Sequence, residues 1–421
     1  MLDPSFEPQD RIGDMSTSPK QVQLADGRPP KPVGTYEELV ARAELLIPIL
    51  RERAEETEEL RQLPLATKKD LETAGVARIL QPSRYGGCEG HFFGMVEILT
   101  RVGCGCGSTG WCLAQYIGHN YMVSQWPVEA QDEIWGVKPE SLISGILIPL
   151  KGKAQKVDGG YRLSGRWPFV SGVNTCDWCI LSGMVENPHG DDEERYFLMQ
   201  NGTFEIIDTW HSIGLKGSGS HDIAVDDAFI PDHRTLPIEY LKGGPSPGNR
   251  VNTAPMYQMP SYMQFGILIT SATLGIAAGM LEYYRDYIAG HEALMSGKVS
   301  RLEVPQHLKV AEASVCVDSA HAIARGICDE IVAHAQAGTL PSDEERTKYR
   351  AHGAFIGRQA WRAANVIWDA VMGRGVYENN PIGRSYRDMC AASRHFTHNW
   401  DVNGVSYGRV LLGLPLDNPS L

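Results

Sequence analysis

One short segment of the sequence combines the residue types that suit a flat, partly apolar ligand. It reads Trp167-Pro168-Phe169-Val170-Ser171-Gly172 and follows a turn at Asp158-Gly159-Gly160 whose flanking residues alternate as strands do. Aromatic rings pack against a planar face, the Ser171 hydroxyl offers one hydrogen bond, and Gly172 lets the backbone approach closely. The alternative interpretation is a strand end in the core of a β domain, and these six residues by themselves favour it.

Three polar residues on otherwise apolar segments are further candidates for chemistry. His119 lies on the helical pattern Trp111–Asn120, Ser144 lies in the apolar strand Leu142–Ile146, and His395 is expected in the last helix. A histidine near its unperturbed pKa of about 6.5 can serve as a base or a hydrogen-bond partner. Each also has a structural interpretation, as a core or surface histidine or as a hydroxyl bonded to the backbone.

Two segments match known binding motifs, but the surrounding sequence argues against both assignments. Gly105-Cys106-Gly107-Ser108-Thr109-Gly110 matches G-x-G-x-x-G, but a dinucleotide fingerprint follows a strand and the preceding Phe93–Val102 has helical spacing. We expect Ser108 and Thr109 to cap the next helix instead. Cys176-Asp177-Trp178-Cys179 is a C-x-x-C without a second pair, so neither zinc binding nor thioredoxin-like chemistry is expected. We therefore predict no metal site.

Composition narrows the classes of protein. The chain has 421 residues, of which 43% are hydrophobic and 21% charged, as in globular proteins of two or three domains. A net charge of −12 argues against binding to nucleic acid or to an anionic membrane. Nine irregularly spaced cysteines, and no signal-peptide pattern at Met1–Pro8, predict reduced thiols in the cytoplasm. The longest apolar run, Phe265–Met280, is short for a membrane span and is expected in a helix bundle or a subunit interface.

The pattern along the chain changes three times and predicts the elements that position these residues. Residues 1–34 are expected to form a disordered or loosely docked tail, and 35–140 a helical domain. Short alternating strands over 141–242 predict a compact β domain. Residues 243–421 predict a four-helix bundle, with helices at about Ser261–His291, Pro305–Ala337, Asp343–Met372 and Tyr386–Gly413.

From about residue 35, the chain resembles the acyl-CoA dehydrogenase superfold. Within that superfold it resembles the oxygenase components of two-component flavin monooxygenases, such as the p-hydroxyphenylacetate 3-hydroxylase and 3-hydroxy-9,10-secosteroid hydroxylase types. The resemblance implies an N-terminal helical domain, a small β-barrel and a C-terminal four-helix bundle. Seven segments in the same order carry it: Leu60–Pro64, Gln81–Gly87, Gly107–Trp111, Gln131–Trp135, Trp167–Gly172, Trp210–Ser220 and Arg387–His395.

The resemblance implies that one group of residues holds the flavin. Ser171 would bond to N5 of reduced FMN or FAD, and Trp111, Trp167, Phe169 and Gly172 would surround the ring system. In such enzymes, reduced flavin and O2 form a C4a-hydroperoxide that hydroxylates an aromatic, usually phenolic, substrate. The hydroperoxide survives when water is excluded and N5–H is held, and a neutral apolar pocket with one or two hydroxyls meets both needs.

The resemblance also implies the substrate contacts and the partners. His119 and Ser144 would contact the substrate hydroxyl, and His395 would lie close to the reactive edge of the flavin. A separate NAD(P)H:flavin reductase would supply the reduced cofactor, and the assembly would be a homotetramer. The sequence departs from the pattern at Ala289–Met295, which lacks the family's arginines, so the choice between FMN and FAD stays open. It also has a single serine at Leu142–Gly145, where relatives have several.

Two alternative functions stay open from the sequence. An acyl-CoA dehydrogenase needs a carboxylate base to remove the α-proton of a thioester. The family's Tyr-Glu-Gly-Thr stretch is missing at Cys390–His395, and Glu378 lies elsewhere, in an expected loop. The other alternative is a non-enzymatic helical scaffold that binds no reduced flavin.

Overall fold

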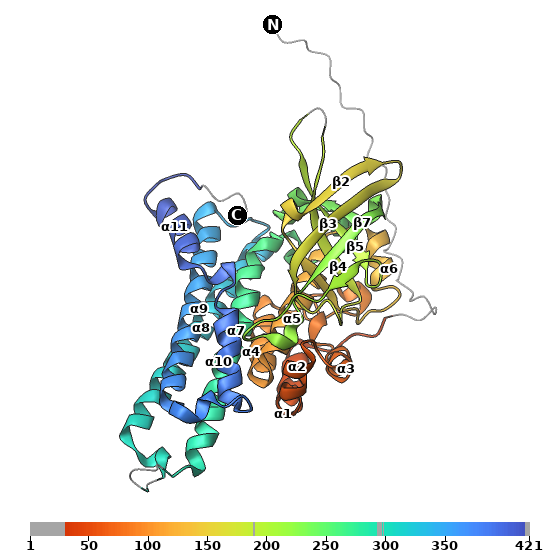
Figure 1. The fold of residues 1–421 in the computed structure, drawn as a ribbon. Helices are drawn as coiled ribbons and strands as arrows, with labels where there is room; N and C mark the ends of the chain where they lie inside the picture. Colours follow the sequence, from red (N-terminus) through yellow and green to blue (C-terminus); the bar gives the residue numbers. More distant parts are fainter. Residues whose placement is uncertain (1–29, 188–189, 293–296, 298, 417–421) are drawn as a thin grey trace.

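The computed structural model describes residues 30–187, 190–292, 297 and 299–416. The predicted tail at 1–34 therefore lies outside the described residues up to residue 29. Along the described chain, a group of helices precedes an eight-stranded sheet and a second group of helices follows it (Figure 1). The predicted fold class, mainly α with a central β domain, is confirmed.

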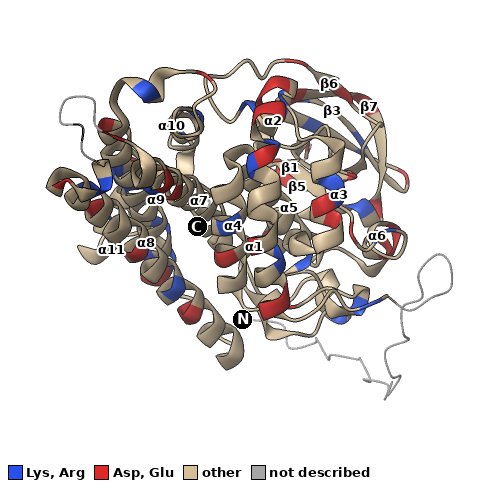
Figure 2. Ribbon diagram, turned by 90° about the horizontal axis from the view of Figure 1, so that it is seen from below, with Lys and Arg blue, Asp and Glu red and all other residues tan. Residues whose placement is uncertain are grey.

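The first group of helices supplies the layer that carries Trp111 and His119. It consists of α1 (Tyr36–Glu52), α2 (Ala54–Leu60), α3 (Leu65–Ala74), α4 (Phe92–Gly105), α5 (Gly107–Val123) and α6 (Val128–Ile134). Helices α4 and α5 are almost wholly buried, whereas charged residues gather on outer helices such as α1 and α2 (Figure 2). Helix α5 therefore holds its side chains in a closely packed interior.

The glycine-rich corner between α4 and α5 serves packing. An added Cβ on Gly110 would lie 2.7 Å from the Cα of Gly103, so the two helices cross at van der Waals contact only because both residues are glycine. The expected caps at Ser108 and Thr109 are wrong. Helix α5 begins at Gly107, and its N-cap Cys106 makes no side-chain capping hydrogen bond.

The β domain is a mixed sheet with strand order β6-β7-β3-β2-β4-β5-β8, and β1 pairs in parallel with β4. Its strands are β1 (Ile143–Ile146), β2 (Gly152–Val157), β3 (Gly160–Val170), β4 (Trp178–Val185), β5 (Glu193–Gln200), β6 (Glu205–Ile207), β7 (His221–Pro231) and β8 (Thr235–Pro237). The β2–β3 hairpin turns at Gly159, whose φ is +72°. The pairing of β3 with β7 shifts register between Trp167 and Val170, which frees the end of β3 from the regular ladder.

The second group of helices contains α7 (Ser261–Gly290), α8 (Val304–Ala337), α9 (Asp343–Val371), α10 (Pro381–Ala392) and α11 (Trp400–Leu411). The first three coincide with prediction within one residue at each end. The single helix expected at Tyr386–Gly413 is wrong, because residues 393–399 interrupt it. The side chains of His395 and Asn399 accept backbone N–H groups of residues two or three positions ahead, which ends one helix and caps the next. His395 therefore lies on the α10–α11 connection, not within a helix.

Helix α7 is long and apolar enough to cross a membrane, but 89% of its most apolar window is buried inside the molecule. It packs against α4, α5, α8, α9 and α10 and forms the centre of the helical layers (Figure 1). Of the two expectations for Phe265–Met280, the bundle is confirmed and the subunit interface is wrong, because this face is already covered within one chain.

Candidate functional site

A buried hydrogen-bond chain centres on Ser171, directly after β3. The Trp111 indole N–H on α5 donates to the Ser171 hydroxyl at 3.1 Å. That hydroxyl lies 2.8 Å from the Ser220 hydroxyl, which lies 2.7 Å from the hydroxyl of Ser218. All three serines are at least 95% buried, so the Ser171 hydroxyl is held in place from both sides away from bulk water.

The residues on either side of Ser171 have positive φ angles, which residues other than glycine rarely adopt. Phe169 has a φ of +65° although it is not a glycine, and its ring is 59% exposed, edge-on to Trp210. Gly172 has a φ of +74°, and an added Cβ would lie 2.3 Å from the Tyr116 hydroxyl. Such strain persists where surrounding structure imposes it and is common at ligand sites. It turns the Phe169 ring outward at the rim of the site.

Trp167 lies apart from this cluster. Its indole is fully buried within the sheet, where its N–H donates to the Ser182 carbonyl at 2.8 Å. It packs against Gly152 and Gly165, whose missing side chains leave room for the ring. The structure thus gives Trp167 a packing role in the β domain, and its contact with flavin stays a prediction.

Strand β1 lies between His119 and Ser171, with Gly145 against the histidine and Ser144 bonded to the serine. The Ser144 hydroxyl donates to the Ser171 carbonyl at 2.6 Å. An added Cβ on Gly145 would lie 2.7 Å from His119 Nε2, so the imidazole rests directly on the backbone of β1. His119 is 99% buried and its Nδ1 has no hydrogen-bond partner. Burial lowers the pKa of His119 to about 4, although the neighbouring backbone of Gln115 and Ile143 favours the charged form, so the ring is neutral at pH 7.

His395 reaches the same site from the α10–α11 connection. Its ring lies edge-on to that of Trp111, with centroids 5.5 Å apart, and its Nδ1 lies 2.9 Å from the Thr397 hydroxyl. Burial, and then the charge of Arg350, lower the pKa of His395 to about 4. The structure therefore brings His395, Trp111 and Ser171 together, as the sequence-based hypothesis required.

Sequence reasoning missed two buried charged residues here. Arg350 on α9 is 6% exposed, and its Nε donates to Asn403 Oδ1 at 3.3 Å. Within the described residues it forms no ion pair. Asp388 on α10 accepts the backbone N–H of Leu215 at 2.6 Å, and burial raises the pKa of its carboxyl to about 7. The Arg387-Asp388 pair was visible in the sequence, but nothing there indicated that the acid is buried.

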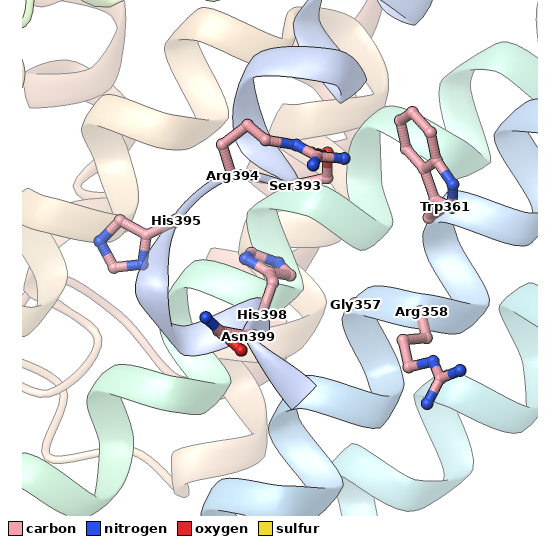
Figure 3. A pocket seen from close by; sticks show the side chains of 8 residues that line it. All are labelled: Gly357, Arg358, Trp361, Ser393, Arg394, His395, His398 and Asn399. Atoms are coloured by element: carbon pink, nitrogen blue, oxygen red, sulfur yellow. Dashed lines mark hydrogen bonds between the residues drawn. The ribbon is translucent and has the colours of Figure 1, made fainter. Parts of the chain in front are cut away.

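A cavity of about 430 Å³ adjoins His395 between α9 and the α10–α11 connection. Figure 3 shows Arg394 and Trp361 at one end of it, Arg358 at the other, and the His398 ring between the connection and α9. The remaining lining residues are Gly357, Ser393, His395 and Asn399. The cavity and the Ser171 cluster therefore share His395.

Comparison with known proteins gives the family. The FADH2-dependent resorcinol hydroxylase oxygenase component of Rhizobium sp. is 31% identical over 96% of this chain and 98% of its own length. The pigment production hydroxylase of a Rhodococcus sp. is 30% identical over 92% and 99%. The chain belongs to the oxygenase components of two-component flavin-dependent monooxygenases. Residues 267–400 match the family model described as acyl-CoA dehydrogenase, C-terminal domain.

Solved structures agree with this family. The 3-HSA hydroxylase from Rhodococcus sp. RHA1 superposes with a TM-score of 0.86, at 29% identity over 91% of this chain and 99% of that one. This oxygenase thus uses reduced flavin and O2, and its flavin comes from a separate reductase. The thioester-oxidation and scaffold alternatives are set aside. Thioester oxidation would need a carboxylate base in the site. Glu378 is instead exposed on the loop before α10, and the Asp388 carboxylate accepts a backbone N–H.

The residues present fit a flavin. Trp111 offers an aromatic edge, Ser171 a hydroxyl whose position is fixed, and Gly172 a backbone without a side chain. The unpartnered nitrogen of His119 supplies the orphaned buried polar atom that a bound ligand would satisfy.

Proposed function

We propose that this oxygenase hydroxylates a small phenol, with the substrate hydroxyl bound between His119 and Ser144. The observation that carries the proposal is the neutral, buried His119 imidazole with an unpartnered nitrogen, next to a serine that is bonded to Ser171. Relatives support a phenol, since one is named for resorcinol and another for p-hydroxyphenylacetate.

In this proposal, each residue has a defined task. When bound, reduced flavin supplies the electrons that activate O2 for transfer of one oxygen atom, while the other leaves as water. The neutral His119 ring accepts a hydrogen bond from the substrate hydroxyl, which raises the electron density of the ring carbon beside it. Ser144 donates its only proton to the Ser171 carbonyl, so it fixes the backbone beside the substrate hydroxyl and leaves the hydroxyl proton to His119. Ser171, held by Trp111, offers its hydroxyl to N5 of the flavin.

We further infer reduced FAD as the working cofactor, a homotetrameric assembly and a cytoplasmic location. The resorcinol hydroxylase is named for FADH2. Exposed Val304, Leu308 and Val315 recur at helical spacing along α8, so they form an apolar stripe that self-association would cover. All nine cysteines are free, which suits a reducing compartment. Light scattering of the purified chain tests the assembly.

The test of the proposed reaction is product formation from a phenol panel with FADH2 and 18O2. We expect one labelled hydroxyl in the product for wild type. His119→Gln and Ser144→Ala should lower product per flavin oxidised by about 10-fold or more, because each alters the polar surroundings of the substrate hydroxyl. Unchanged product yield in both variants contradicts the substrate assignment. Bleaching of bound oxidised flavin by acyl-CoA under anaerobic conditions would contradict the reaction itself.

A further inference from the structure

Asp388 on α10 is a buried acid that contacts two separate supports of the Ser171 site. It is 94% buried, and its Oδ1 accepts the backbone N–H of Leu215 at 2.6 Å. An added Cβ on Gly107 would lie 2.7 Å from Oδ2, so the other carboxyl oxygen lies against the first residue of α5. Burial disfavours the charged form of a carboxyl, and the proposed reaction gives this acid no task.

The first contact anchors a turn that carries hydroxyl groups to Ser171. Leu215 begins this turn with a φ of +51°, a conformation that bulky side chains adopt only where the surroundings impose it. Its carbonyl accepts the Ser218 N–H at 3.0 Å, and the Ser218 carbonyl accepts the Gly172 N–H at 2.7 Å. From the Ser218 hydroxyl, the chain of hydroxyls continues through Ser220 to Ser171. The bond to the buried carboxyl therefore fixes the turn on which the position of the Ser171 hydroxyl depends.

The second contact fixes the start of α5, the helix that carries Trp111. The N-cap residue Cys106 makes no side-chain capping hydrogen bond, so the positive end of this helix lacks its usual cap. Negative charge is favourable at that end, and Gly107 has no side chain to keep a carboxyl away. Trp111 lies one turn farther along α5 and donates to Ser171 at 3.1 Å. The same acid thus also positions the indole that holds the Ser171 hydroxyl.

The charge of Asp388 changes near neutral pH. The charged and titratable groups around it come from several elements and are Glu58, Arg384, Arg387, Lys216 and Cys106. The three cations each lie within 3.8 Å of a Glu58 oxygen, and Asp388 forms no ion pair with any residue that the structure describes. Burial raises the pKa of Asp388 to about 7, against the effect of the Leu215 N–H, and burial also raises the pKa of the Cys106 thiol. A carboxylate accepts an N–H more strongly than the neutral acid does, so the Leu215 bond strengthens as pH rises.

We propose that Asp388 is a positioning residue for oxygen transfer, because it holds both supports of the Ser171 hydroxyl, the Leu215 turn and α5. The inference rests on the proposed contact between Ser171 and N5 of the reduced flavin. Loss of the carboxylate loosens both supports. More of the reduced flavin and O2 then ends as oxidised flavin and H2O2, and less as oxidised flavin, hydroxylated product and water.

The test compares two variants of Asp388 with a control on the same helix. Asp388→Asn keeps an oxygen for the Leu215 N–H but carries no charge, and Asp388→Leu removes the acceptor at similar volume. The control is Tyr386→Phe, which loses a bond from α10 to Asn365 at 2.9 Å and belongs to neither support. Hydrogen exchange of the flavin-free chain, read by mass spectrometry, follows the amides of Leu215 and Gly172. Product and H2O2 per flavin oxidised are then measured with the phenol panel from pH 6 to pH 8.

In the flavin-free chain, we expect Asp388→Leu to speed exchange at both amides by about 10-fold or more, the effect of losing a bond to a charged group. Product per flavin oxidised should rise with pH in wild type and in Tyr386→Phe. In Asp388→Asn it should stay throughout at the low level that wild type shows at pH 6. Unchanged exchange, a wild-type pH profile in Asp388→Asn, or the same losses in Tyr386→Phe overturn the proposal.

Failure of the proposed function gives a different pattern. If wild type hydroxylates no phenol, the proposed substrate is contradicted, while faster exchange and faster H2O2 release in Asp388→Leu still support positioning by Asp388. If Asp388→Leu does not fold, the pH profile of Asp388→Asn decides the question. Faster exchange without any change in product per flavin oxidised overturns the role of Asp388 in oxygen transfer.

Discussion

Trp111 contacts His395 edge to face at 5.5 Å while its indole N–H donates to Ser171 at 3.1 Å. One side chain on α5 therefore fixes a residue of the β domain and a residue of the C-terminal helices. The three parts of the fold meet at a single indole.

Replacing Trp111 with phenylalanine should uncouple the reaction. Trp111→Phe keeps a ring against His395 but removes the donor to Ser171, a bond worth about 1 kcal/mol in stability. We expect less product and more hydrogen peroxide per flavin oxidised, measured together in one assay. Trp126→Phe is the matched control, because Trp126 is also buried and its indole nitrogen has no hydrogen-bond partner. Coupling that falls equally in both variants would show that lost volume, rather than the lost N–H, is responsible.

A single methyl group should displace His119. In Gly145→Ala, the new Cβ would lie 2.7 Å from Nε2 and 2.8 Å from the Ile180 carbonyl oxygen, so both the imidazole and the pairing of β1 with β4 must shift. We expect product yield to fall as it does in His119→Gln, together with a lower melting temperature. Gly326→Ala on α8 is the control, since nothing lies within 4 Å of its added Cβ. Full activity in Gly145→Ala would show that the position of His119 is not critical.

Asp388 should make the protein less stable as pH rises. Its folded pKa of about 7 lies above the ordinary value of 3.8, so the folded state holds a proton that the unfolded chain has released. Stability from this group is full below pH 3.8 and is lost as pH rises toward 7. The Asp388→Asn variant has no carboxyl to ionise at this position. The difference between its free energy of unfolding and that of wild type should therefore rise by about 2 to 3 kcal/mol from pH 5 to pH 8. Urea unfolding of both proteins at pH 5 and at pH 8 measures this change. A difference in stability that does not depend on pH contradicts the raised pKa of Asp388.

The buried histidines should make the protein less stable as the pH falls. Burial lowers the pKa of His119 and His395 to about 4 and that of His398 to about 3, below the ordinary 6.5. The unfolded chain takes up protons first, so stability is full above pH 6.5 and falls as pH drops toward 4. At about 1.4 kcal/mol per pH unit, each histidine contributes on the order of 3 kcal/mol across this range. His398→Asn should flatten the acid side of the unfolding curve, and an unchanged slope would contradict a neutral His398.

Much of the fold follows from local sequence pattern. The boundaries of α7, α8 and α9 follow from apolar spacing, and strands within 141–242 follow from alternation with turn residues, because these signals are local. The break between α10 and α11 is hidden, since residues on both sides keep helical spacing. Its cause is side chains of His395 and Asn399 that compete for backbone N–H groups.

The site was predictable in part. The resemblance named Trp111, Ser171, His119, Ser144 and His395, and the structure brings them around one point, although their roles stay predictions. The partners of Ser171 were not predicted, because Ser218 and Ser220 reach it only through tertiary folding. The sequence also does not show which buried charged or polar groups lack a partner. That Arg350 is buried without an acid, or that both nitrogens of His398 lack partners, depends on which distant residues surround them.

The hydroxyl of Ser144 rests on the carbonyl of Ser171, the same residue whose own hydroxyl faces Trp111. Ser171 thus uses its carbonyl toward β1 and its hydroxyl toward α5. Under the proposed function, a substitution at Ser144 would therefore also disturb the hold of Ser171 on the flavin, because Ser144 bonds the Ser171 carbonyl. Phe265 is the better position for changing substrate preference, because its ring lies 5.9 Å from that of His119 and its side chain makes no hydrogen bond to Ser171.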